Sequence, residues 1–496
     1  MSNLPHELYT AVQTRELERI VTQQHNISSA KLMSCAGTAA LEAIRNHFPL
    51  ARHILIVCGT GNNGGDGFEL ATQALAKDYR VSIFQLGDER GMSEETTTAR
   101  KALLATGTEI QRVADKLPTA DVIVDALFGT GLNREVSGDY ALVIEDINQH
   151  SKHTPVLALD IPSGIHADTG QELGTAVRAT ITLSFLGLNT GLFTGDGPSF
   201  CGKVIFDSLK VPPSIYNVFP PTARRVSLEK DAAGLKPRER TGHKGLYGHL
   251  LIIGGDHGMS GAARLAAEAG GRVGAGLISV ATRSAHSAFF NLTRPELMCH
   301  GVEDAGDLEA LLSSANALTI GPGLGQGEWG AALFQKALEA KLPMVVDADA
   351  LNLLSKNPQH RDNWVLTPHP GEAARLLGCS SKEVQSDRFA AIGELQKRYG
   401  GVVVLKGSGT LISNGETPIR LSTYGNPGMG SGGMGDVLAG VIGGLLAQHF
   451  KVMDAACVGV TMHGMAADKT AEQDGERGTL AMDLMPHLRK LANLNY

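Results

Sequence analysis

The sequence is poor in cysteine and tryptophan, and it has no long apolar run. Its 496 residues include 6 cysteines and 2 tryptophans. The cysteines are scattered without C-x-x-C spacing, which argues against a disulfide framework and against a zinc site; they are Cys35, Cys58, Cys201, Cys299, Cys379 and Cys457. No run approaches the ~18–20 apolar residues that span a bilayer, and the first residues lack the basic-then-apolar pattern of a secretory signal. We therefore expect a cytoplasmic protein with reduced thiols and no membrane partner.

Positive charge is also in short supply. The net charge is −7 at pH 7, which argues against a nucleic-acid or anionic-membrane surface. Hydrophobic content of 43% with 19% charged residues describes a well-packed soluble protein. At roughly 100–200 residues per domain, the length predicts two to four domains. The 60 glycines gather in loops after apolar runs, a habit of α/β proteins that bind nucleotides or phosphates.

The most informative stretch is glycine-rich and lies near the C-terminus. Six of the eleven residues 425–435 are glycine, and the apolar residues 437–445 that follow predict a buried helix. A glycine-rich loop at a helix start leaves backbone N–H groups facing outward, which suits a phosphoryl group. Asp436 at that helix start could accept a proton from a hydroxyl under attack. The alternative, an ordinary Asp N-cap below a glycine turn, does not explain so many glycines.

The first half alternates strands and helices, which predicts a mainly parallel, doubly wound sheet. The expected strands are 53–58, 81–86, 121–124 and 155–159, with helices at 33–47, 68–77 and 96–106. The polar loops 59–67, 125–135 and 160–164 follow three of these strands. Such sheets bind ligands at the carboxyl ends of their strands, so these loops predict a binding site.

Two further interpretations compete within these loops. Gly59-x-Gly61-x-x-Gly64 satisfies the dinucleotide fingerprint, but the loop carries two Asn and an Asp, and the acid expected after the second strand is at best Asp88, slightly late. A plain dehydrogenase is therefore the weaker hypothesis. Asn63, Asp125, Asp160 and Ser163 offer oxygen ligands of low total charge, which suit a hard, monovalent cation better than zinc. Helix capping is the alternative for each of the last three.

A proline-rich stretch separates the two halves. It contains Val211-Pro212-Pro213 and Phe219-Pro220-Pro221, and no strand–helix alternation resumes before His249. We interpret 211–240 as a linker with an exposed lead-in and place the boundary near 220.

The second half predicts another α/β sheet with its polar loops on one edge. The expected strands are 249–253, 277–281, 317–320, 344–346, 364–366 and 402–405, with a small-residue helix at 261–275. His369 lies between two prolines at a strand end and is a candidate substrate contact. Lys406 with Gly407, Ser408 and Gly409 is a candidate phosphate or nucleotide contact, with a β-turn as the alternative. Together with Asp436, these loops indicate one nucleotide-dependent phosphoryl-transfer site.

The motifs of both halves form a recognisable set. The first half carries Asn62-Asn-Gly-Gly-Asp66, Asp125 with Gly129-Thr-Gly-Leu-Asn-Arg-Glu135, and Asp160-Ile-Pro-Ser163. The second half carries Gly321-Pro-Gly-Leu-Gly, Thr367-Pro-His-Pro-Gly-Glu, Lys406-Gly-Ser-Gly-Thr, and Asn426-Pro-Gly-Met with Gly433-Met-Gly-Asp436. With these motifs the chain resembles the bifunctional NAD(P)H-hydrate repair enzymes of prokaryotes over essentially its whole length. The family implies two doubly wound α/β domains. Residues 1–220 would be a Rossmann-like three-layer epimerase domain, and residues 221–496 a ribokinase-like, ADP-dependent dehydratase domain.

The resemblance also implies roles for individual residues. The hydrate in the epimerase domain would contact Asn62, Asn63, Gly64, Gly65, Asp66, Gly129, Thr130, Gly131, Leu132, Asn133, Arg134, Glu135 and the catalytic Asp160. Potassium would be bound by Asn63, Asp125 and Ser163. The hydrate in the dehydratase domain would contact Gly323, His369 and the catalytic Asp436. The adenine nucleotide, as ADP with magnesium, would be bound by Lys406, Gly407, Ser408, Gly409, Thr410, Asn426 and Gly435.

The chemistry implied by the family fits the glycine-rich stretch. Phosphoryl transfer would convert the hydroxyl of a hydrated nicotinamide into a good leaving group, with Asp436 as base. The first domain would interconvert the R and S hydrates of NADH and NADPH, because the second uses only the S form. We expect small-molecule partners and a homo-oligomer. Two alternatives remain: a ribokinase-type coenzyme or vitamin kinase with an accessory domain, and a non-catalytic first half.

Overall fold

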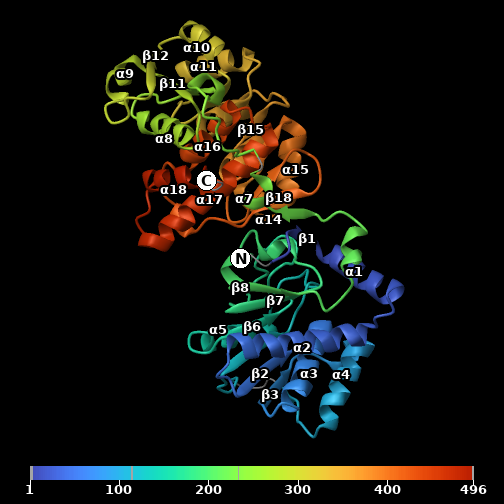
Figure 1. Cartoon of the computed structure of the whole chain (residues 1–496). Coiled ribbons are helices and arrows are strands. Elements are labelled where there is room, and N and C mark those ends of the chain that lie inside the picture. The colour runs from blue at the N-terminus through green and yellow to red at the C-terminus, as the bar shows by residue number, and fades with distance from the viewer. Residues whose placement is uncertain (1–3, 113–115, 233, 494–496) are drawn as a thin grey trace. The chain divides into compact units, whose positions relative to one another are not determined.

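A computed structural model describes residues 4–112, 116–232 and 234–493, which form two compact units that meet in the chain at Arg224 and Arg225. Figure 1 shows both units, each built from strands and helices that alternate along the chain. Among the described residues, no helix is both long and apolar enough to cross a membrane.

The first unit is a three-layer sandwich around a parallel sheet of order β4-β3-β2-β5-β6-β7-β8. Side chains of a strand alternate between its two faces. Ile54 and Ile56 therefore pack with helices α2, α3 and α4, whereas Leu55 and Val57 pack with α5 on the other face. The strands of this sheet are β2 (His53–Cys58), β3 (Arg80–Gln85), β4 (Gln111–Arg112), β5 (Val122–Ala126), β6 (Val156–Leu159), β7 (Ile181–Phe185) and β8 (Lys203–Asp207). Outside it, β1 (Glu7–Leu8) pairs antiparallel with β9 (Ala223–Arg225), which spans the boundary between the units. The helices are α1 (Ala11–Gln24), α2 (Ser29–His47), α3 (Asn62–Leu75), α4 (Glu94–Ala105), α5 (Asp139–His150) and α6 (Gly197–Phe200).

Helix α3 begins earlier than the sequence predicts. The expected loop 59–67 is short, because the helix starts at Asn62 with Gly61 as its N-cap. Its glycines permit this close packing: a Cβ on Gly64 would lie 2.1 Å from the carbonyl oxygen of Gly59, and one on Gly65 would lie 2.5 Å from Met33. These glycines therefore bring the helix start close to the end of β2.

The second unit is built on a sheet of order β18-β17-β16-β15-β14-β13-β10-β11-β12. It is parallel from β12 to β16, and β17 and β18 add antiparallel strands. The strands are β10 (His249–Ile253), β11 (Leu277–Thr282), β12 (Met298–Gly301), β13 (Ala317–Ile320), β14 (Met344–Val346), β15 (Trp364–Leu366), β16 (Val402–Leu405), β17 (Thr410–Ser413) and β18 (Ile419–Ser422). The helices are α7 (Leu228–Asp231), α8 (Ser260–Arg272), α9 (Ser284–Phe290), α10 (Glu309–Ser314), α11 (Glu328–Glu339), α12 (Ala348–Lys356), α13 (Pro370–Leu377), α14 (Ser381–Ser386), α15 (Arg388–Tyr399), α16 (Met434–Ala447), α17 (Val452–Asp474) and α18 (Met485–Leu491).

Helix α16 is the buried helix expected after the glycine-rich stretch. Its own glycines serve packing: a Cβ on Gly440 would lie 2.0 Å from the carbonyl oxygen of Ala266, and one on Gly444 would lie 2.7 Å from that of Gly270. Small residues on both helices let the backbones of α16 and α8 approach closely. The contact fixes α16 against α8.

The prediction for 211–240 is wrong in part. Residues 236–240 are exposed, as expected of a lead-in. Arg225, however, lies in β9 with 6% of its surface exposed, and the Val226 N–H donates to the carbonyl of Leu421 at 2.9 Å. Val226 and Leu228 belong to the hydrophobic core of the second unit. Their apolar side chains make this segment part of the fold. The sequence prediction missed this because the neighbouring prolines and arginines suggested an exposed linker.

Candidate active sites

In the first unit, a cavity of about 550 Å³ opens at the carboxyl ends of β2, β5 and β6. In the sheet, β3 lies on one side of β2 and β5 lies on the other. The order of the strands therefore reverses between β2 and β5, and the loops that follow these two strands lead to opposite sides. This topological switch point is where doubly wound sheets bind ligands. The cavity is lined by Thr14, Arg15, Glu18, Ser29, Leu32, Met33, Ala36, Thr60, Gly61, Asn62, Asn63, Asp66, Leu127, Phe128, Gly129, Thr130, Gly131, Leu132, Asn133, Arg134, Tyr140, Asp160, Phe185, Leu186 and Leu209.

Most of the predicted epimerase residues lie together around this cavity. Ten of them line it: Asn62, Asn63, Asp66, Gly129, Thr130, Gly131, Leu132, Asn133, Arg134 and Asp160. Gly64 and Gly65 lie behind it, in the contacts of α3 with Gly59 and Met33, and Glu135 is exposed outside it. Sequence reasoning missed Arg15 and Glu18, which α1 contributes to the wall. No local motif marks these two residues, because only the packing of α1 places them at the cavity.

Three carboxyl groups face this cavity, and burial raises the pKa of each. For Glu18 the burial effect is reinforced by the charge of Glu95. The pKa of Asp66 lies well above its ordinary value because of burial, followed by the charges of Asp160 and Glu18. Burial raises the pKa of Asp160 to about 6, although the Thr130 N–H donates to its carboxylate at 3.0 Å. A cluster of this kind can hold and exchange protons near neutral pH.

Asp160 also has an unusual backbone conformation. Its φ is +65°, in the left-handed region that a residue with a Cβ rarely occupies. Such strain gathers at functional sites, where the surrounding structure holds it in place. Here the strained turn directs the carboxylate toward the loop after β5, where its Oδ2 accepts the hydrogen bond from Thr130.

The predicted cation ligands Asn63, Asp125 and Ser163 are buried next to the cavity and share a network. Ser163 donates to Asp125 twice, from its Oγ at 2.6 Å and its N–H at 2.8 Å. The Asn63 amide donates to the carbonyl oxygen of Phe128 at 2.9 Å, so its Oδ1 is held in place as an acceptor. That Oδ1 has no hydrogen-bond partner in the part of the chain that the structure describes, although Asn63 is only 6% exposed. A buried acceptor without a donor beside a carboxylate fits a cation of low charge.

In the second unit, the glycine-rich stretch lies at the surface and feeds α16. Gly430 and Gly432 are exposed, and Gly433 caps the helix with a φ of +90° and no side-chain cap. Asp436 lies in the first turn of α16 and is therefore not the N-cap, so the capping alternative does not apply. Its carboxylate stands where the helix dipole and backbone N–H groups favour an anion.

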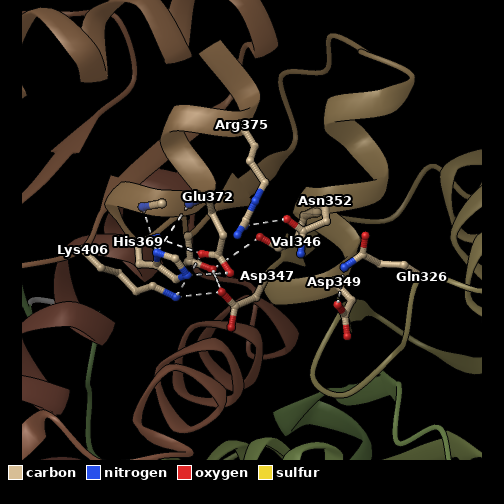
Figure 2. A network of polar contacts seen from close by, with 11 residues as sticks. Gln326, Val346, Asp347, Asp349, Asn352, His369, Glu372, Arg375 and Lys406 are labelled. Atoms are coloured by element: carbon tan, nitrogen blue, oxygen red, sulfur yellow. Dashed lines mark hydrogen bonds and ion pairs between the residues drawn. The ribbon is translucent and has the colours of Figure 1, made fainter. Parts of the chain in front are cut away.

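An ion network with Lys406 at its centre forms where β14, β15 and β16 end (Figure 2). The charges of Asp347 and Lys406 in this network act on Asp436. Lys406 Nζ lies 2.9 Å from Asp347 Oδ1 and 3.9 Å from Glu372 Oε2. Thr367 donates to the same Asp347 oxygen at 2.8 Å. A Cβ on Gly435 would lie 3.2 Å from Lys406 Nζ, so the start of α16 lies directly against this lysine.

The charges of this network set the protonation states of the site. Burial and then the neighbouring charge of Asp347 raise the pKa of Asp436 to about 7, against the opposing effect of Lys406. Burial would lower the pKa of Lys406, but the carboxylates of Asp347 and Glu372 outweigh it and raise the pKa. Lys406 therefore stays a cation, while Asp436 exchanges a proton near neutral pH, as a general base requires.

His369 caps α13 and contributes to the same rim. Its Nδ1 accepts hydrogen bonds from the N–H groups of Gly371 at 3.0 Å and Glu372 at 3.4 Å, which places the ring proton on Nε2. The side chain is 52% exposed, and burial followed by the charge of Lys406 lowers its pKa. Its Nε2 lies 3.5 Å from Glu372 Oε1. The half-exposed, neutral ring can therefore contact a ligand at this rim.

The remaining predicted residues lie at neighbouring loops. Gly323 is buried with a φ of +59°, and the Asp256 N–H donates to its carbonyl oxygen at 2.6 Å, which joins the loops after β10 and β13. Asn426 uses its side chain to hold the glycine-rich loop, accepting from Gly428 and donating to Asp468, both at 3.0 Å. Residues 406–409 form the turn between β16 and β17, in which Gly407 and Ser408 are exposed, and Thr410 begins β17.

Sequence reasoning assigned no site role to Asp347 or Glu372. The sequence did contain a feature that could have identified them, since both acidic residues come after predicted strands that end at the same edge of the sheet. Asp347 directly follows β14, and Glu372 comes after β15 in the first turn of α13. The pairing with Lys406 depends on the order of β14, β15 and β16 in the sheet and is not visible in the sequence.

Comparison with known proteins finds a separate family match in each half of the chain. Residues 250–490 match the family model described as NAD(P)H-hydrate dehydratase, and residues 29–191 match that of the YjeF-related protein N-terminus. The bifunctional NAD(P)H-hydrate repair enzyme of Coxiella burnetii is 48% identical over 98% of this chain and 99% of its own. That of Escherichia coli is 44% identical over 99% of this chain and 95% of its own. A ribokinase-like superfamily protein from Enterococcus faecalis has a TM-score of 0.50 at 28% identity, covering 56% of this chain and 97% of its own.

The fold and the sites thus define a two-domain α/β enzyme whose second unit is ribokinase-like. The full-length similarity goes further: the chain belongs to the family of bifunctional NAD(P)H-hydrate repair enzymes. It combines epimerase and dehydratase activities toward hydrated NADH and NADPH, so the plain dehydrogenase is ruled out.

Proposed function

We propose that the second unit dehydrates the S hydrate at the start of α16, using ADP as phosphoryl donor. The observation that carries this assignment is Asp436, whose pKa of about 7 and position beside Lys406 suit a base next to a phosphate site. Asp436 accepts the proton of the hydrate hydroxyl as that oxygen attacks the transferred phosphoryl group. Lys406 and the N–H groups at the helix start hold the group's negative charge. Departure of phosphate from one ring carbon, with loss of a proton from the adjacent ring carbon to solvent, then restores the double bond of NADH or NADPH.

The other predicted residues of this unit would bind the two ligands. Gly323 and His369 contact the hydrate, and the loop 406–410 with Asn426 and Gly435 contacts the adenine nucleotide. Magnesium supplies charge neutralisation on the phosphates of ADP. We expect those phosphates to provide most of its ligands, because Asp347 and Glu372 are already paired with Lys406.

We propose that the first unit epimerises the R and S hydrates in its cavity. Asp160 serves as a proton-exchanging group, and the ten predicted residues that line the cavity hold the nucleotide. Asn63, Asp125 and Ser163 would bind potassium, supported by the buried, unpartnered Asn63 Oδ1. Potassium would supply positive charge that keeps Asp125 ionised, since burial raises the pKa of Asp125 to about 6.

We place the functional boundary between the two units near residue 220. We also propose that the protein is a cytoplasmic homo-oligomer. The free state of all six cysteines is consistent with a reducing compartment.

One experiment tests both assignments. Purified enzyme is given a mixture of R and S hydrates of NADH with ADP, and NADH fluorescence, AMP and phosphate are followed. The proposal predicts conversion of the whole mixture, with one AMP and one phosphate released per NADH. Asp160→Ala should leave the R hydrate unconverted, and Asp436→Ala should stop NADH formation. A phosphorylated alcohol that accumulates without NADH would instead identify a ribokinase-type kinase, and unchanged epimerisation in Asp160→Ala would favour a non-catalytic first half.

A further inference from the structure

The turn between β16 and β17 contains two glycines whose backbone conformation must be stabilised by contacts from outside the turn. Gly407 and Gly409 adopt φ values of +136° and +64°, in the region that favours glycine because it lacks a Cβ. Glycine gives the turn this conformation but does not enforce it, because glycine backbones are the most flexible ones. A site that receives a nucleotide works best when its backbone is already ordered.

A buried arginine lies directly beneath this turn. Arg388, the first residue of α15, is 1% exposed. Its Nη2 donates to the carbonyl oxygens of Leu405 at 3.1 Å, Lys406 at 3.3 Å and Gly409 at 3.4 Å, and its Nη1 also donates to Lys406 at 3.3 Å. Nη1 makes a further bond to the side chain of Gln385 at 2.8 Å, which orients the guanidinium. One side chain therefore binds both ends of the turn.

These contacts determine which way the peptide groups of the turn face. In a trans peptide the C=O and the following N–H point in opposite directions. The Lys406 carbonyl points down onto Arg388, so the Gly407 N–H points away from it, toward the exposed side of the turn. The same rule holds one residue earlier, where the Leu405 carbonyl faces Arg388 and the Lys406 N–H reaches the carbonyl of Pro368 at 2.9 Å. That bond ties the turn to the His369 loop.

Gly407 lies so close to the guanidinium that a larger residue would strain the turn or displace the arginine. A Cβ at this position would lie 2.8 Å from Nη1 and 3.2 Å from Nη2 of Arg388. The Arg388 guanidinium therefore occupies space that is open only because Gly407 has no side chain. Arg388 also remains a cation at neutral pH, since burial lowers its pKa only to about 10.

We propose that Arg388 is a positioning residue for adenine-nucleotide binding: by gathering the carbonyl oxygens of residues 405–409 beneath the turn, it presents the opposite face of that turn, with the Gly407 N–H, to the nucleotide. This inference rests on the proposed function of the turn as a nucleotide contact. Arg388 itself touches no ligand, because it is buried below the backbone that would do so. A lysine cannot replace it, since an ammonium group lacks the planar fork that reaches several carbonyls at fixed spacing.

The test compares Arg388→Lys with a matched control. Arg361 also donates to two carbonyl oxygens, those of Leu338 at 3.0 Å and Ala340 at 2.8 Å, but it precedes β15 and so lies at the opposite edge of the sheet. Arg388→Lys should raise the KM for ADP by about tenfold or more, because several charge-assisted hydrogen bonds are lost. The KM for the hydrate at saturating ADP should change by less than about twofold, since the carbonyl oxygens that Arg388 binds, at 405, 406 and 409, lie outside the loops of Gly323 and His369. Arg361→Lys should leave both constants near the wild-type values.

A second measurement and a second variant guard against loss of folding. Hydrogen exchange of the amides in 406–410, measured without ligand, should be faster in Arg388→Lys than in wild type and unchanged in Arg361→Lys. Gly407→Ala keeps the buried arginine but forces the turn away from it, so it should also raise the KM for ADP. A KM for ADP in Arg388→Lys within about twofold of wild type, whether or not exchange changes, would overturn the inference. Inactive wild-type enzyme would instead refute the proposed function.

Discussion

Replacing Asp436 with asparagine should abolish dehydration and stabilise the second unit at the same time. Asparagine keeps the size of the side chain but cannot accept the proton. A general base typically contributes about 10²–10⁴-fold, so we expect kcat for NADH formation to fall by that factor. Binding of ADP should persist, because the backbone N–H groups at the start of α16 and Lys406 are unchanged.

The gain in stability follows from the raised pKa. Burial and Asp347 move the pKa of Asp436 from its ordinary value of 3.8 to about 7, so folding opposes ionisation. The resulting loss of stability grows as pH rises from 3.8 and is complete above about 7. A pKa difference of this size corresponds to a change in the free energy of unfolding of at most about 4 kcal/mol. Because the Asp436 side chain is partly solvated, we expect a change of about 1–2 kcal/mol. Asparagine never ionises, so the variant avoids this loss.

Both tryptophans of the chain, Trp329 and Trp364, are buried in the second unit, so their fluorescence follows unfolding of that unit. Urea denaturation at pH 8 should show Asp436→Asn to be more stable than wild type, and the advantage should shrink at pH 5. Asp454→Asn is a matched control, because Asp454 also lies in the first turn of a helix, α17, but is exposed. Turnover retained by Asp436→Asn, or an advantage that does not depend on pH, would refute the reasoning.

Three further predictions follow from other contacts. The kcat/KM for dehydration should rise about tenfold from pH 6 to pH 8, because the ionised fraction of a base with a pKa of about 7 grows from about one tenth to about nine tenths. In Asp347→Asn the midpoint of this pH profile should move to lower pH, since the variant lacks a charge that raises the pKa of Asp436. Epimerase activity should increase with potassium in wild type and become weak and indifferent to potassium in Asp125→Ala; equal responses of the two proteins would count against the cation site. Gly440→Ala should destabilise the second unit by about 1–3 kcal/mol in urea, because its Cβ would overlap the Ala266 carbonyl; an unchanged midpoint would show that α8 and α16 can separate without loss.

The sequence predicts much of this architecture because the relevant signals are local. The strands of both units are short apolar runs bounded by glycine and polar residues, and those predicted at 53–58, 249–253 and 317–320 agree with β2, β10 and β13. Parallel sheets bring the ends of such strands to one edge, so the order of residues along the chain is enough to assign the loops after them to binding sites. The glycine-rich stretch and Asp436 at the start of α16 are predicted in the same way.

Only the tertiary structure shows which side chains meet. Lys406 and Asp347 are 59 residues apart in the chain, and their contact depends on the order of β14, β15 and β16. Glu18 and Arg388 carry no motif, yet one reaches the cavity and the other holds a turn from below. Gly64 and Gly65 show the reverse, since a motif suggested ligand contact where the structure shows helix packing. The physical reason is that apolar periodicity and turn residues act over a few neighbours, whereas a pKa, an ion pair or a buried hydrogen bond arises only after burial brings distant segments together.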